Sequence, residues 1–198
     1  MAYDKFTRLT SSVVPLPIEN VDTDQIIPAR FLKATERKGF GDNLFRDWRY
    51  HQDGSPKADF VLNDSTYSGK ILVGGKNFGS GSSREHAAWA IYDYGFRCVI
   101  SSFFADIFKN NCLNIGVLPV QVSEDFLQAI FAAVEKDPNT TVTVGLQSQT
   151  VTLEATAQQE RFEISSYKKQ NLENGFDDID YLLNIESAIK DFAQSRPF

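Results

Sequence analysis

The stretch ILVGGKNFGSGSSREHAAWAIYDYGFRCVIS (residues 71–101) decides the fold class of this chain. Its two ends, residues 71–74 and 98–101, are short apolar runs typical of buried strands. Between them, a cluster of glycines leads into a segment with a small apolar face, which predicts a helix from about Ser83 to Tyr94. Gly95 follows at the position where a left-handed residue commonly ends a helix. A strand, a helix and a second strand in this order predict an α/β arrangement.

The alternation continues on the C-terminal side of this stretch. Residues 103–116 predict a second helix, and residues 117–122 predict another buried strand. The pattern then predicts an amphipathic helix, a β-hairpin, one more strand and a C-terminal helix, in the segments Glu124–Lys136, Thr140–Ala155, 161–165 and Ile179–Phe192. This order predicts a partly parallel central sheet flanked by helices.

The N-terminal side is richer in turns. Residues 12–32 begin with a short predicted strand and continue with Asp22, Thr23 and Asp24, which are residue types that cap helices and form turns. Residues 33–59 are charged and contain several glycines, so they predict a long loop with one helical turn near Asn43–Trp48. Residues 60–62 predict a further short strand.

The length of 198 residues suits one large domain with an appendage. We expect an α/β domain over residues 1–165, which includes the loop 33–59. We expect a C-terminal helical extension over residues 166–198 that packs on this domain.

Composition disfavours several classes of protein. The net charge is −6 without any basic block, which disfavours nucleic-acid binding. No run reaches the roughly 18 apolar residues of a membrane span, and no secretory segment follows Met1, so we expect a cytoplasmic protein. The two cysteines, Cys98 and Cys112, are too few for an iron–sulfur cluster or a structural zinc site, so we expect no metal in this chain.

The segment with the most chemistry is Asn77–Ala87. Gly79 and Gly81 allow a tight turn with positive φ, and Ser82 with Glu85 fits a capping box at the start of the helix. Arg84 adds a cation whose planar fork suits a carboxylate. Helix N–H groups, a hydroxyl and a guanidinium would then converge where a small anion could bind. The alternative is a purely structural turn with a capping serine, and the pattern alone does not separate the two.

Several motifs together resemble one known family. Residues 81–87 (GSSREHA) resemble the signature of the swivelling domain of the aconitase superfamily. Residues 22–28 (DTDQIIP) resemble the opening motif of isopropylmalate isomerase small subunits of the bacterial type. Further blocks resemble the same family in the same order, at residues 104–108, 118–120 and 175–180. The resemblance therefore covers nearly the whole chain, and it implies an aconitase-type swivelling β/β/α domain.

The resemblance also implies a function. Such small subunits act with a large subunit that carries a [4Fe–4S] cluster, and together they isomerise 2-isopropylmalate to 3-isopropylmalate by dehydration and rehydration in leucine biosynthesis. By resemblance, Ser82 is the base that removes a proton, Arg84 is catalytic and binds a substrate carboxylate, and Ser83 contacts the substrate. Asp24 aligns near the active site, where it either orients Arg84 or acts only as a turn cap.

The loop after Phe31 is where family members select the substrate side chain. By resemblance, Leu32, Lys33 and Arg37 contact the substrate, although ordinary packing also explains Leu32. Ala34 departs from the family pattern, which leaves the accepted side chain open. The alternatives are a sister enzyme acting on 2-methylmalate or homocitrate, and a non-catalytic anion-binding module without a cluster-bearing partner.

Overall fold

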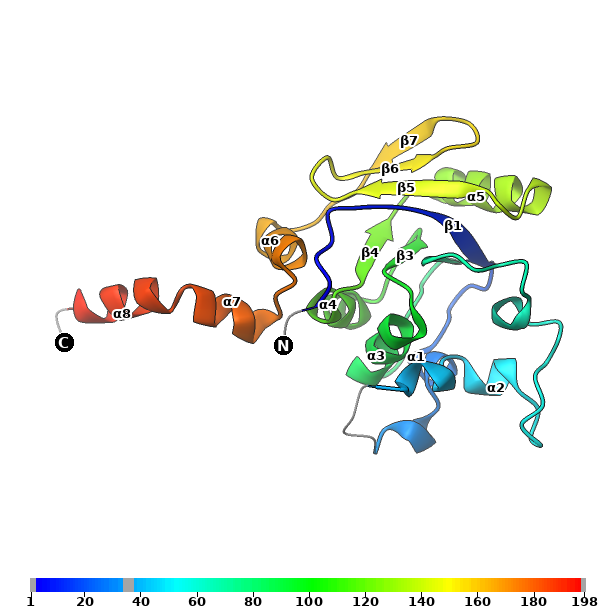
Figure 1. Ribbon diagram of the computed structural model, residues 1–198, viewed down its shortest axis with the longest axis horizontal. Coiled ribbons are helices and arrows are strands. Elements are labelled where there is room, and N and C mark those ends of the chain that lie inside the picture. The colour runs from blue at the N-terminus through cyan, green and yellow to red at the C-terminus, as the bar shows by residue number, and fades with distance from the viewer. Residues whose placement is uncertain (1–2, 34–37, 197–198) are drawn as a thin grey trace.

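Parallel and antiparallel strands share a single seven-stranded sheet in the computed structural model, which describes residues 3–33 and 38–196. The sheet order is β4-β3-β2-β1-β5-β6-β7 (Figure 1). The strands β4, β3, β2 and β1 are parallel to one another, and β5, β6 and β7 continue the sheet from β1 in antiparallel fashion. The strands are β1 (Arg8–Leu16), β2 (Ile71–Gly74), β3 (Cys98–Ser101), β4 (Leu118–Gln121), β5 (Thr141–Gly145), β6 (Thr150–Leu153) and β7 (Gln158–Arg161). The predicted α/β fold with a partly parallel central sheet is confirmed.

Helices connect and flank these strands, except that α7 and α8 extend away from the sheet after the last strand (Figure 1). The α-helices are α1 (Thr23–Ile26), α2 (Arg46–Arg49), α3 (Glu85–Tyr94), α4 (Asp106–Ile115), α5 (Glu124–Lys136), α6 (Ser166–Asn174), α7 (Asp178–Asn184) and α8 (Glu186–Gln194). In the part of the long connection between β1 and β2 that the structure describes, there are three 3-10 helices, η1 (Ala29–Phe31), η2 (Phe40–Asn43) and η3 (Val61–Asn63). No helix in the described ranges is long and apolar enough to cross a membrane.

Alternate side chains of the central strands belong to two separate hydrophobic clusters. Leu72 and Val99 belong to the cluster that packs beneath α1, α3 and α4. Their neighbours Ile71 and Cys98 belong to the second cluster, which packs against α5 and the antiparallel strands. Because successive strand residues point to opposite faces, both faces of β2 and β3 are buried, and their residues are apolar except for the buried Ser101 at the end of β3.

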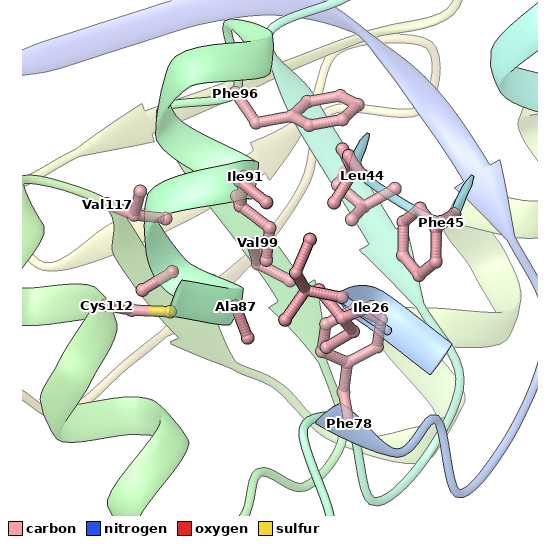
Figure 2. Packing of buried hydrophobic residues seen from close by; sticks show 14 of the residues in the cluster. Ile26, Leu44, Phe45, Phe78, Ala87, Ile91, Phe96, Val99, Cys112 and Val117 are labelled. Carbon is pink, nitrogen blue, oxygen red and sulfur yellow. The ribbon is translucent and has the colours of Figure 1, made fainter. Parts of the chain in front are cut away.

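The first cluster supports the loops at the carboxyl ends of the parallel strands. Figure 2 shows Phe78 and Ile26 among its side chains, together with Ala87 from α3. The Phe78 ring is fully buried and lies edge-on to Phe104 and Phe108, with ring centroids 6.4 and 5.5 Å away. This packed group of aromatic side chains therefore supports the loop that follows β2.

Several of the predicted elements differ from the structure. Residues 60–62 were expected to form a strand, but η3 occupies Val61–Asn63, since both edges of β2 are already paired with β1 and β3. The strand expected at 161–165 lies earlier, at Gln158–Arg161. The helix expected over Ile179–Phe192 is two helices, because the backbone departs from helical geometry at Ile185.

We predict that Phe78→Ala lowers the free energy of unfolding by about 3–5 kcal/mol, because it empties a buried aromatic position. The matched control is Phe103→Ala, since Phe103 is 47% exposed and its loss should change stability by about 0.5 kcal/mol or less. Urea denaturation of both variants measures the difference. Equal losses in the two variants would contradict the assignment of Phe78 to the core.

Candidate active site

The loops that follow β1 and β2 are joined by backbone hydrogen bonds. The amides of Gly79 and Ser80 donate to the carbonyl of Val21 at 2.8 and 3.0 Å. In return, the amide of Thr23 donates to the carbonyl of Ser80 at 2.9 Å. The pairing of the parallel strands thus continues beyond the sheet into the loops.

The loop that follows β3 joins the same arrangement. The amide of Phe78 donates to the carbonyl of Phe103 at 3.0 Å, and the amide of Ala105 donates to the carbonyl of Phe78 at 3.2 Å. We refer to residues 21–23, 78–80 and 103–105 together as the loop ladder. Through it, three segments far apart in the sequence have fixed positions at one edge of the sheet.

Asp22 caps the short helix α1 at the centre of the loop ladder. Its carboxylate accepts a hydrogen bond from the amide of Asp24, and the side chain of Gln25 accepts one from the amide of Asp22, which completes a capping box. Gly81 passes directly over this carboxylate, with φ +87° and so little space that an added Cβ would lie 2.3 Å from Oδ2 of Asp22. The expectation that Asp22 is a cap and that Gly81 has positive φ is confirmed.

Ser82 lies on the loop before α3, and its position is set by α1. The hydroxyl of Thr23, itself buried, donates to the carbonyl of Ser82 at 2.8 Å. The predicted capping box of Ser82 and Glu85 is wrong, because α3 begins at Glu85 and its N-cap is Arg84, which makes no side-chain capping bond. The Ser82 side chain is therefore exposed, and its hydroxyl makes no hydrogen bond to the residues that the structure describes. A hydroxyl not engaged in capping is available to a ligand.

Arg84 is ordered by two contacts with the α1 region. Its guanidinium forms an ion pair with the carboxylate of Asp24 and donates a second hydrogen bond to the carbonyl of Ile27 at 3.4 Å. The Arg84 side chain is only 13% exposed, whereas that of Asp24 is 49% exposed. Of the two interpretations of Asp24, its contact with Arg84 supports an orienting role, since the cap of α1 is Asp22.

Ser82 and Arg84 line one hollow of about 270 Å³. The start of α4 forms the facing wall, with Asp106 and Ile107 in its first turn. The N-cap of α4, Ala105, has no side chain that could cap the helix, so the first N–H groups of α4 lack a side-chain acceptor. The N-terminal ends of α3 and α4 thus converge on the hollow, and helix N-termini favour negatively charged ligands. Asp106 adds a carboxylate to the same wall.

Of the expected site residues that the structure describes, Asp24, Ser83, Leu32 and Lys33 lie outside this lining. Ser83 is exposed on the same loop. Leu32 is half-buried against the first hydrophobic cluster, and Lys33 is exposed. Arg37 falls outside the described residues. The structure therefore brings Ser82, Arg84 and Asp24 together and leaves the contribution of the loop after Phe31 as a prediction.

Sequence reasoning did not identify Thr23 as part of the site, nor the start of α4. The signal for α4 was present in the motif at residues 104–108, which carries part of the family resemblance but contains no obvious catalytic group. Thr23 was treated only as a turn former. Its contact with Ser82 spans 59 positions of sequence and has no local signature.

No group of three or more metal-ligating side chains occurs among residues 3–33 and 38–196. Cys98 and Cys112 are both fully buried, and burial raises the pKa of each thiol, so both remain protonated. Two buried thiols are also fewer than the three or four thiolates that an iron–sulfur cluster usually needs, so the cysteines of this chain do not fit such a cluster.

Comparisons with known proteins find relatives that match nearly the whole chain. Residues 3–125 match the model of the aconitase C-terminal domain. The 3-isopropylmalate dehydratase small subunit of Cytophaga hutchinsonii is 60% identical over 98% of this chain and 97% of its own length. The corresponding subunit of Christiangramia forsetii is 59% identical over 98% of this chain and 94% of its own length.

The chain belongs to the family of 3-isopropylmalate dehydratase small subunits. Its fold is also similar to a crystal structure of 3-isopropylmalate dehydratase from Methanocaldococcus jannaschii, with a TM-score of 0.69 at 23% identity over 93% of this chain and 98% of that one. The small-subunit fold is therefore an aconitase-type domain, and the hollow at the loop ladder lies within the part that matches the aconitase model.

We predict that Thr23→Val speeds amide hydrogen exchange at Gly79 and Ser80, whose amides donate to the carbonyl of Val21, because the loop loses the contact that holds the carbonyl of Ser82 to α1. A hydrogen bond contributes about 0.5–1.5 kcal/mol, which corresponds to roughly two- to twelve-fold faster local exchange. Thr10→Val is the control, since it removes a hydroxyl that bonds Thr143 within the sheet. If exchange at Gly79 and Ser80 is unchanged in Thr23→Val, the threonine does not hold the serine loop.

Proposed function

We propose that this small subunit combines with a large subunit to isomerise 2-isopropylmalate to 3-isopropylmalate, with Ser82 as the base and Arg84 as the carboxylate clamp. One observation supports this most strongly: an unengaged serine hydroxyl and an ordered arginine line one hollow between two helix N-termini. The reaction is inferred from relatives that are 59–60% identical over nearly the whole chain and are named 3-isopropylmalate dehydratase small subunits.

The first step of a dehydration removes a proton from a carbon beside a carboxylate. A serine hydroxyl is a very weak acid, so its anion requires stabilisation. Ser82 lies on the loop that leads into α3, opposite the start of α4, where helix N–H groups and dipoles favour negative charge. The cation of Arg84 lies on the same wall. These groups together lower the energetic cost of an alkoxide at Ser82.

Arg84 is suited to hold a substrate carboxylate in two-pronged fashion. Asp24 and the carbonyl of Ile27 fix the guanidinium from the side of α1. A guanidinium carries five N–H donors, so donors remain for a ligand after these contacts. Because the arginine is ordered before binding, little side-chain entropy is lost when the substrate arrives. Ser83, exposed on the same loop, would add a hydroxyl contact to the substrate.

The partner completes the site. The family name of this chain, a small subunit, implies a large subunit, to which we assign the [4Fe–4S] cluster. When bound, such a cluster supplies a Lewis acid that stabilises charge developing on substrate oxygens. The residues of this chain supply the base and the clamp. We place the assembled enzyme in the cytoplasm, where leucine is made.

The side chain of the substrate is selected, in this proposal, by the loop after Phe31. Leu32 would contact the isopropyl group, and Lys33 and Arg37 would lie beside it with charges for a carboxylate. Leu32 has the required apolar character and is only half-buried, so part of it remains accessible to a ligand.

We predict that Ser82→Ala in the assembled complex lowers kcat by roughly 10²–10⁴-fold with little change in substrate binding, because a general base acts mainly in the transition state. Ser83→Ala should instead raise KM more than it lowers kcat, since we propose that this serine only binds. Steady-state kinetics on complexes with equal cluster content measure both. A Ser82→Ala complex that retains most of its kcat would remove this serine from the mechanism.

Arg84→Lys should lower kcat/KM by roughly 10- to 150-fold, because a lysine cannot reproduce the two-pronged charged contact, which contributes about 1.5–3 kcal/mol. Arg97→Lys is the matched control, since Arg97 also pairs with an aspartate, Asp4, but lies outside the hollow. The same assay compares the two variants. Similar losses in both would show that the effect is not specific to the hollow.

Leu32→Ala should change the preference among 2-alkylmalates by roughly ten- to two-hundred-fold, the range expected when a pocket loses methylene contacts. Leu32→Ile keeps the apolar volume and should leave the preference nearly unchanged. The ratio of kcat/KM for the isopropyl and methyl substrates measures the effect. Unchanged ratios in Leu32→Ala would exclude Leu32 from the side-chain pocket.

A further inference from the structure

The helices α7 and α8 extend away from the rest of the molecule as an arm (Figure 1, orange to red). Eight large apolar side chains are exposed among the described residues, and five of them lie on this arm. The five side chains on the arm are 45% to 67% exposed. They are Ile179, Leu182, Leu183, Ile189 and Phe192. So many exposed apolar side chains on one short segment indicate a surface that another molecule covers.

These side chains form one stripe on each helix. Ile179, Leu182 and Leu183 are spaced by three and four residues on α7, and Ile189 and Phe192 are spaced by three on α8. Tyr181 lies on the opposite side of α7 from this stripe, and its ring packs edge-on against Tyr167 of α6 at 4.6 Å. The body of the protein is therefore in contact with one side of α7, and the apolar side is left without cover.

The root of the arm is held in place by polar contacts. The carboxylate of Asp178 accepts hydrogen bonds from the hydroxyl of Tyr167 at 2.7 Å and the ammonium of Lys168 at 2.6 Å. Burial alone would raise the pKa of Asp178, but these hydrogen bonds outweigh burial and hold that pKa below its ordinary value. The carboxylate thus stays charged at neutral pH, and the arm leaves α6 in a defined direction.

Charge narrows the choice of partner. Within α7 and α8, four carboxylates oppose a single lysine, at Asp178, Asp180, Glu186, Asp191 and Lys190. Helices that lie on membranes usually carry a basic polar face, which this arm lacks. Pairing with the same arm of a second copy would place acidic residues near acidic residues. A groove that is apolar at its centre and basic at its rim complements the arm.

The extent of the match to related small subunits also indicates a large subunit as the partner. The aconitase domain match ends at residue 125, well before the arm. The match to the Cytophaga hutchinsonii small subunit nevertheless covers 98% of this chain, so the arm lies within the length that such subunits share. A segment shared by small subunits, outside the matched domain, fits the partner that small subunits have in common.

We propose that the apolar stripe of α7 and α8 docks into a basic-rimmed apolar groove of the large subunit, at a site separate from the catalytic hollow. This inference rests on the proposed function only in requiring a large subunit. The arm would hold the two chains together while the loop ladder presents Ser82 and Arg84.

The test is the affinity of full-length small-subunit variants for the matching purified large subunit, measured by calorimetry without substrate. Leu183→Asp with Ile189→Asp places charges in the stripe and should weaken binding by at least ~30-fold, as for other interface hot spots. Ser187→Asp with Gln194→Glu adds the same charge on the polar face of α8 and should bind like the wild type. A third variant, Leu183→Ala with Ile189→Ala and Phe192→Ala, favours the helix while it removes the apolar contacts, and it should also bind weakly.

At saturating large subunit, all variants should keep the wild-type kcat, because the hollow is untouched. Wild-type affinity in the alanine variant would overturn the proposal. It would also be overturned if the stripe variants dissociated a dimer of the small subunit in light scattering, or if the wild-type chain bound vesicles of phosphatidylcholine and phosphatidylglycerol. The calorimetry measures binding of the large subunit without turnover. If the proposed role of Ser82 is wrong, only the kcat of Ser82 variants is affected, and the outcome of this binding test does not change.

Discussion

The backbone hydrogen bonds between the loops after β1, β2 and β3 are the constraint on which the site depends. They carry the order of the parallel strands beyond the sheet, so that Thr23, Ser80 and Ala105 have fixed relative positions. Phe78 supports these bonds from below, since its ring is buried while its amide and carbonyl both pair with the third loop. Without this ladder, Ser82 and Arg84 would lie on a glycine-rich loop with no defined relation to α1 or α4.

Much of the fold was predictable from the sequence, because its central elements have strong local signals. The strands at 71–74 and 98–101 and the helix Glu124–Lys136 occur where the apolar pattern placed them. The start of α3 was misplaced by two residues, because a serine followed by glutamate fits a capping box locally, whereas the N-cap of α3 is Arg84 and the nearby capping box belongs to Asp22 at the start of α1. The break at Ile185 and the helix α6 have no strong apolar signal and were missed.

The candidate site was predictable only in part. Ser82 and Arg84 stood out through the glycines before them and through the family resemblance. The bond from Thr23 to Ser82 and the wall formed by α4 are products of the strand order, which brings together segments about 60 to 80 positions apart along the chain. The geometry also separates the two roles that we propose for this subunit. The loop ladder positions Ser82 and Arg84, the proposed base and clamp, and the exposed apolar stripe at the far end of the chain is the proposed surface for assembly.

The central claim is that this chain positions a base and a carboxylate clamp for chemistry that needs a second subunit. The most direct measurement is the turnover of 2-isopropylmalate by the purified small subunit, by the matching large subunit with its cluster intact, and by an equimolar mixture of the two. Turnover is expected in the mixture and in neither chain alone. Turnover by the small subunit in the absence of any large subunit would contradict the claim.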